Sequence, residues 1–136
     1  MEEKFAGLAK SFDESPYAAT LGMKLVELGE GYARVSLEVT RAHDNWDGVT
    51  HGGLVMSLAD QAFGCSVNTL GRRYVALQLN IHFLAACNAP QSLVAEGRVI
   101  HAGRRAGVAE MLVRDEQERL IARASGTVIG LEERPA

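Results

Sequence analysis

A single carboxylate interrupts an otherwise uncharged segment of the chain. Between Gly52 and Gly71 the sequence reads GGLVMSLADQAFGCSVNTLG, and Asp60 is its one residue that acts as an acid or base at neutral pH. On a helical wheel, apolar side chains cover most of the circumference, and Asp60 lies at the edge of a narrow polar stripe. Burial in such a setting raises a carboxyl pKa. Asp60 is therefore a candidate general base or nucleophile. A structural Asp bonded to a backbone amide or to an arginine is the alternative.

The residues that begin this segment also suit chemistry. His51 is followed by Gly52 and Gly53, two poor helix formers that let a ligand approach the backbone closely. The first N–H groups of a helix have no partner inside it, and the helix dipole favours negative charge there. Such donors suit the oxyanion that forms in acyl transfer. A tight packing turn without a ligand is the alternative.

Hydrophobic periodicity predicts the elements that must hold these residues. It predicts helices within residues 1–20 and over residues 51–70, and residues 42–50 form a loop in which Trp46 is the expected anchor. Alternating or mainly apolar runs predict strands over residues 23–30, 32–40, 74–84, 93–101, 107–114 and 119–129. Links of hairpin length make the sheet antiparallel. We therefore expect one α+β domain over residues 1–136, with the sheet wrapped around a long central helix.

Composition narrows the class of protein. The 136 residues are 47% hydrophobic and 23% charged, with a formal net charge of −3, which favours a packed soluble domain and argues against nucleic-acid binding. No apolar run reaches the ~18 residues of a membrane span. Cys65 and Cys87 form no zinc or redox motif, so we expect free thiols and a cytoplasmic location. The His and Asp residues within 43–51 lack metal-ligand spacing, so no metal is expected.

The combination of these motifs is more specific than its parts. Residues 45–53, NWDGVTHGG, followed by SLADQAF over residues 57–63, resemble the hotdog-fold acyl-CoA thioesterases. The nearest branch is the phenylacetic-acid-degradation, or PaaI-type, thioesterases. The shared pattern is an Asn six positions before His-Gly-Gly and an Asp nine positions after the His. The resemblance covers nearly the whole chain, including NIHFL at residues 80–84.

The resemblance implies a role for each matched residue. The Gly52 N–H would hold the thioester carbonyl oxygen, and Asn45 would lie beside that carbonyl or the attacking water. His51 would orient the substrate or lie near the departing sulfur. Asp60 would activate water as general base, or attack directly and form a mixed anhydride. Contacts with the substrate or its CoA part would come from Gly53, Leu84, Ala85, Ala86, Arg104, Arg105, Ala106 and Gly107. No cofactor is implied, since CoA is part of the substrate.

Two positions depart from the family pattern. Ala76 stands where some relatives carry a Ser or Thr that helps to place the water, and the usual proline soon after Leu84 is replaced by Ala85-Ala86.

The resemblance as a whole implies hydrolysis of an aromatic acyl-CoA, such as a phenylacetyl-CoA-like thioester, or of a medium- or long-chain acyl-CoA. The alternatives are a hotdog-fold acyl-thioester hydratase or dehydratase, and a non-catalytic acyl-CoA-binding protein.

Helix geometry adds an expectation about assembly. Gly52 and Asp60 are eight residues apart, which is ~12 Å along a helix at ~1.5 Å per residue. One carbonyl cannot be within reach of both groups across that distance. If both serve the same substrate, Asp60 must come from a neighbouring subunit. We therefore expect a homodimer with shared active sites. The resemblance implies the same, with such dimers often pairing into a homotetramer.

Overall fold

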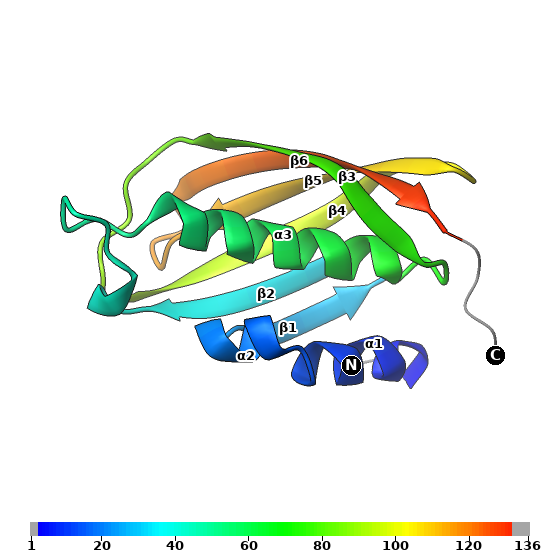
Figure 1. Ribbon diagram of the computed structural model, residues 1–136, viewed down its shortest axis with the longest axis horizontal. Helices are drawn as coiled ribbons and strands as arrows, with labels where there is room; N and C mark the ends of the chain where they lie inside the picture. The colour runs from blue at the N-terminus through cyan, green and yellow to red at the C-terminus, as the bar shows by residue number, and fades with distance from the viewer. Residues whose placement is uncertain (1–2, 132–136) are drawn as a thin grey trace.

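The computed structural model describes residues 3–131 and contains one long helix, shorter helices near the N-terminus and a sheet (Figure 1). The helical elements are η1 (Glu3–Phe5), α1 (Ala6–Asp13), α2 (Pro16–Leu21), η2 (Arg41–His43) and α3 (Gly52–Asn68). The strands are β1 (Lys24–Gly29), β2 (Tyr32–Val39), β3 (Tyr74–Phe83), β4 (Gln91–Ala102), β5 (Ala106–Arg114) and β6 (Leu120–Gly130). The order of the elements is as predicted, and each boundary lies within about three residues of the predicted one.

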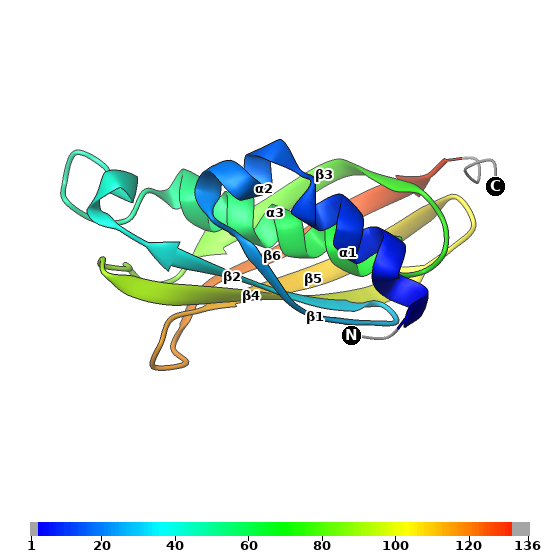
Figure 2. The same ribbon diagram turned by 90° about the horizontal axis from the view of Figure 1, so that it is seen from below.

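The six strands form one antiparallel sheet in the order β1-β2-β4-β5-β6-β3. Helix α3 packs against one face of this sheet, and α1 and α2 lie beside α3 on the β1 side (Figures 1 and 2). The α+β hotdog architecture is confirmed. One expected link differs: the segment after β3 is not a hairpin, because β3 pairs with β6 and β4 pairs with β2 and β5. Strand β3 therefore forms an edge of the sheet.

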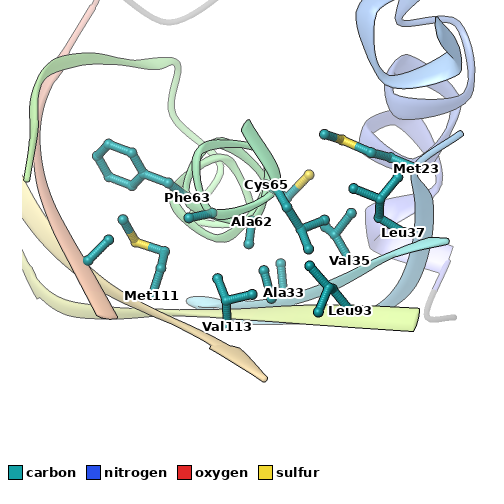
Figure 3. Close-up of a cluster of buried hydrophobic side chains, with 14 of the residues drawn as sticks. Met23, Ala33, Val35, Leu37, Ala62, Phe63, Cys65, Leu93, Met111 and Val113 are labelled. Atoms are coloured by element: carbon teal, nitrogen blue, oxygen red, sulfur yellow. The ribbon is translucent and has the colours of Figure 1, made fainter. Parts of the chain in front are cut away.

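The core lies between α3 and the concave face of the sheet. Figure 3 shows Ala62 and Cys65 of α3 beside Val35 of β2 and Val113 of β5, and all four are at most 4% exposed. A Cβ placed on Gly97 of β4 would lie 2.6 Å from the Ala62 carbonyl oxygen, and one on Gly126 would lie 2.5 Å from the Phe63 ring. These glycines let the helix approach the sheet closely, since any side chain there would push it away.

The expectation that α3 is buried on nearly all sides is wrong for a single chain. The sheet covers one side of α3, while Gly53, Asp60 and Gly64 are exposed along the opposite side. We call these three residues and their intervening surface the open stripe of α3. None of the helices within residues 3–131 is long and apolar enough to cross a membrane. The predicted domain spans residues 1–136, and residues 1–2 and 132–136 of it lie outside the described residues. Residues 1–2 also belong to the predicted helical segment 1–20.

Candidate active site

The His-Gly-Gly turn at the start of α3 is fixed by a short backbone ladder. Asn45 N–H donates to the Val49 carbonyl at 2.7 Å, and His51 N–H donates to the His43 carbonyl at 2.8 Å. His51 is the N-cap of α3, and its Nδ1 accepts a hydrogen bond from the Gly53 N–H at 2.8 Å. The Gly52 N–H, by contrast, makes no hydrogen bond within residues 3–131. The predicted donor for an oxyanion is therefore available, and the Gly53 amide is already occupied.

Gly52 faces a cavity of about 360 Å³ at the end of the edge strand β3. The Phe83 ring closes in on this glycine: a Cβ on Gly52 would lie 3.2 Å from its nearest ring carbon. The lining residues are Thr50, Gly52, Val55, Phe83, Leu84, Ala85, Ala86, Cys87 and Ile121. The structure thus brings the predicted contacts Leu84, Ala85 and Ala86 together with Gly52. We call this space the Gly52 cavity.

A second cavity of about 270 Å³ lies on the other side of the same turn. His51, Gly53 and Ser57 line it together with Tyr17 of α2. The Tyr17 and Ser57 hydroxyl oxygens are 2.7 Å apart and hydrogen-bonded, which ties the N-terminal helices to the first turns of α3. His51 and Gly53 therefore open toward this second cavity rather than toward the Gly52 cavity.

Asn45 organises the loop that precedes the turn. Its Oδ1 accepts hydrogen bonds from the Asp47 N–H at 2.9 Å and the Val49 N–H at 3.1 Å. This Asx-type arrangement uses the carbonyl end of the side chain, and the Nδ2 donors form no hydrogen bond in the described part of the chain. The predicted anchoring role of Trp46 in this loop is wrong for the single chain, because Trp46 is 98% exposed.

Asp60 lies two turns beyond Gly52 on the open stripe of α3, and the fold of one chain does not bring the two together. Desolvation by the surrounding apolar helix raises the pKa of the Asp60 carboxyl above its ordinary value of 3.8. Cys65, on the buried side of the same helix, has its thiol pKa raised to about 12 by burial. Burial thus favours the protonated thiol, and Cys65, at 4% exposed, belongs to the hydrophobic core.

The predicted CoA-binding segment Arg104–Gly107 lies at the opposite end of α3 from Gly52 (Figure 1). It includes the turn between β4 and β5, and the Arg72 guanidinium, just beyond α3, donates to the Arg104 carbonyl. Ala76 is exposed on the edge strand β3. No group of three or more His, Cys, Asp or Glu side chains within residues 3–131 is arranged to hold a metal ion.

Five lining residues of the Gly52 cavity were not predicted as site residues: Thr50, Val55, Phe83, Cys87 and Ile121. Thr50 could have been identified from the sequence, because it stands only two positions before Gly52. Cys87 and Ile121 come from distant segments, the loop after β3 and the start of β6. Nothing local in the sequence marks either one, because their place in the site depends on the pairing of β3 with β6.

Comparison with known proteins adds an independent result. Residues 47–122 match the Thioesterase superfamily. The chain is 32% identical over 126 residues to the acyl-coenzyme A thioesterase PaaI of Escherichia coli, covering 88% of this chain and 90% of that protein. The structure of E. coli PaaI superposes with a TM-score of 0.92 at 28% identity, over 96% of this chain and 94% of that one. A hypothetical thioesterase of Streptococcus pneumoniae with coenzyme A superposes with a TM-score of 0.84 at 27% identity, over 93% and 98% of the two chains.

The environment of Asp60 predicts a pH-dependent effect on stability. Because folding raises the pKa of the Asp60 carboxyl, its protonated form contributes to the stability of the folded state below the ordinary value of 3.8. This contribution is lost as the pH rises through the raised pKa. At pH 7.5 the wild type therefore carries an ionised, partly desolvated carboxylate that Asp60→Asn removes. We expect Asp60→Asn to melt at a higher temperature than wild type at pH 7.5, with the difference disappearing below about pH 4.

Thermal melting followed by circular dichroism across this pH range measures the effect. Glu30→Gln, which removes a charge from the exposed β1–β2 turn, is the matched control and should show no comparable rise. A lower melting temperature for Asp60→Asn at pH 7.5 would contradict the assigned desolvation.

Proposed function

Because this chain belongs to the thioesterase superfamily and is an acyl-CoA thioesterase of the PaaI type, we propose that it hydrolyses its thioester at a site built from two chains. One chain supplies the Gly52 cavity and the other supplies Asp60. The observation that carries this proposal is the Gly52 N–H at the N-terminus of α3, which has no hydrogen-bond partner within residues 3–131 and faces a cavity lined mainly by apolar side chains. The substrates proposed are an aromatic acyl-CoA, such as a phenylacetyl-CoA-like thioester, or a medium- or long-chain acyl-CoA.

The Gly52 amide acts on the carbonyl oxygen. When water adds to the thioester carbon, that oxygen takes up negative charge, and the N–H and the α3 dipole both stabilise it. Apolar side chains around the amide, including Val55 and Phe83, strengthen the interaction by excluding water. Since the amide has no internal partner to give up, it is preorganised for this role.

We assign polar roles to Asn45 and His51, although neither residue lines the Gly52 cavity in the single chain. With its Oδ1 engaged in the loop, Asn45 has Nδ2 donors left for the carbonyl or the attacking water. Because His51 Nδ1 accepts from Gly53, the proton of its neutral ring is on Nε2. That N–H orients the substrate or donates a hydrogen bond toward the departing sulfur.

Asp60 of the second chain supplies the base or the nucleophile. As general base it takes a proton from water while the hydroxide adds to the carbonyl carbon, and collapse of the tetrahedral intermediate expels the CoA thiolate. The proton on Asp60 then passes to that sulfur. As nucleophile its carboxylate oxygen adds to the carbonyl carbon and expels the CoA thiolate, which breaks the C–S bond and leaves a mixed anhydride that water then hydrolyses. Desolvation raises the pKa of this carboxyl, which makes its carboxylate a stronger base.

The open stripe of α3 provides the surface for this pairing. Two α3 helices running antiparallel across a two-fold axis place Gly52 of each chain opposite Asp60 of the other. The same pairing moves the arginine end of the second chain closer to the Gly52 cavity. Along the helix axis, the C-terminus of α3 is ~24 Å from Gly52 in its own chain but ~12 Å away in the paired chain. Residues Arg104, Arg105, Ala106 and Gly107 then contact the CoA part, and such dimers pair into tetramers.

The activity itself is tested by replacing Asp60. Asp60→Asn keeps the size of the side chain but removes both the base and the nucleophile, so we expect kcat to fall ~100-fold or more with the fold intact. The assay is release of free thiol from phenylacetyl-CoA and from medium- and long-chain acyl-CoAs, with Glu30→Gln as the matched control. A near wild-type rate for Asp60→Asn would show that the assignment is wrong. Binding without thiol release, or addition of water to an enoyl-CoA, would favour the alternative functions.

The role of the arginine turn is tested through KM. The net charge of −3 repels a polyanionic ligand, so local positive charge must attract the CoA phosphates. Arg104→Ala/Arg105→Ala should raise KM several-fold more than it lowers kcat, and the effect should shrink in high salt. Lys10→Ala/Lys24→Ala removes the same charge from elsewhere on the surface and should leave KM nearly unchanged. An unchanged KM at low ionic strength in the arginine variant removes these residues from the site.

Shared sites are tested by mixing two inactive variants. Gly52→Pro removes the amide donor at the first residue of α3, a position where proline suits the helix backbone. Homodimers of Gly52→Pro and of Asp60→Asn should each be inactive. A mixed dimer has one site with both groups intact and should recover up to about half of the wild-type activity per dimer. No recovery from verified, folded mixed dimers, or a fully active monomer, would refute the shared site.

A further inference from the structure

Thr50, which lines the Gly52 cavity, carries a buried hydroxyl without a hydrogen-bond partner among the described residues. Thr50 lines this cavity two residues before Gly52 and is 6% exposed. Its hydroxyl oxygen Oγ1 is buried and makes no hydrogen bond within residues 3–131. Buried hydroxyl groups in folded proteins are nearly always hydrogen-bonded. An unpaired one therefore destabilises the free chain unless a molecule entering the cavity provides the partner.

The backbone around Thr50 is too well held for a loop movement to supply that partner. Its N–H donates to the Cys87 carbonyl at 3.0 Å, and the backbone ladder described above fixes His51 and Val49 on either side. Rotation about the Cα–Cβ bond by about 120°, however, moves Oγ1 into the place of the methyl group and the methyl group into the place of the hydrogen, and it leaves the backbone in place. The hydroxyl can therefore face the cavity without any change in the turn.

The side chains in the rest of the cavity wall have little to offer a polar atom. Apart from Thr50, the Gly52 backbone and the Cys87 thiol, the lining side chains are apolar: Val55, Phe83, Leu84, Ala85, Ala86 and Ile121. An oxygen that enters this space meets the Gly52 N–H and, once the Thr50 side chain has rotated, the Thr50 O–H as well. A carbonyl oxygen has two lone pairs and can accept from both.

We propose that Thr50 is a further catalytic residue, whose hydroxyl donates a second hydrogen bond to the thioester carbonyl oxygen held by the Gly52 amide. This inference rests on the proposed function, because it requires a thioester in the Gly52 cavity. The second donor strengthens as charge develops on the oxygen, so it acts mainly in the transition state.

A structural role for the same hydroxyl makes the opposite prediction. Asp44 faces Thr50 across an isolated antiparallel bridge, and its Oδ1 is also buried without a partner. Side chains at such a non-hydrogen-bonded pair lie close together. If Thr50 served only to satisfy Asp44, removing the hydroxyl would lower stability and leave kcat unchanged. If it serves the carbonyl, removal would lower kcat and leave stability unchanged or higher.

The test compares Thr50→Val, which keeps the shape and removes the hydroxyl, with Thr50→Ser, which keeps the hydroxyl. Thr69→Val is the matched control: Thr69 is 9% exposed at the other end of α3, and its hydroxyl donates to the Ser66 carbonyl at 2.6 Å and accepts from the Gly31 N–H at 2.7 Å. Thr50→Val should lower kcat by about 10- to 100-fold with KM within about 3-fold. Thr50→Ser should keep at least about a third of kcat. The melting temperature should fall in Thr69→Val and not in Thr50→Val.

Several results would overturn the assignment. A wild-type kcat for Thr50→Val would do so, as would a fall in melting temperature together with equal loss of activity in Thr50→Val and Thr50→Ser. A raised KM with unchanged kcat would place the hydroxyl on a part of the substrate that does not react. If the wild type releases no thiol from any acyl-CoA, both the proposed function and the catalytic role of Thr50 are wrong. If the wild type is active and Thr50→Val is equally active, only the catalytic role of Thr50 is wrong and the proposed function stands.

Discussion

The close approach of α3 to the sheet determines the rest of the structure. Positions 97 and 126 lack side chains where the helix backbone and the Phe63 ring press against the strands, so the helix sits deep in the concave face. Its rotation is then set by the side chains that are buried there. That rotation leaves the open stripe on the far side and directs the first turn of α3 toward the end of β3, where the Phe83 ring meets Gly52.

Much of this arrangement could be predicted from local patterns in the sequence. The α3 helix was evident from a long apolar segment, and the strands from alternating side chains bounded by turns. Asp60 was found because it is the one carboxylate in that segment, and Gly52 because glycine at a helix start exposes a backbone donor. Each of these signals comes from residues within a few positions of one another.

What could not be predicted depends on contacts between distant segments. The pairing of β3 with β6 brings Ile121 and Cys87 beside Gly52, and no short pattern encodes that choice of neighbour. The helical wheel counts apolar residues but does not say which side a sheet covers, which is why the exposure of Asp60 was missed. The separation between Gly52 and the Arg104 turn likewise became clear only once both ends of α3 had been placed.

The N-cap of α3 limits what its histidine can do. A doubly protonated imidazole has no lone pair at Nδ1, so it cannot accept the Gly53 N–H that it holds at 2.8 Å. The ring can donate a hydrogen bond from Nε2 while the helix start stays closed. To deliver a whole proton it would first have to become an imidazolium and release Gly53. The hydrogen bond that caps the helix and the uptake of a second proton thus require the same Nδ1 lone pair, so the cap favours a neutral His51 that donates from Nε2.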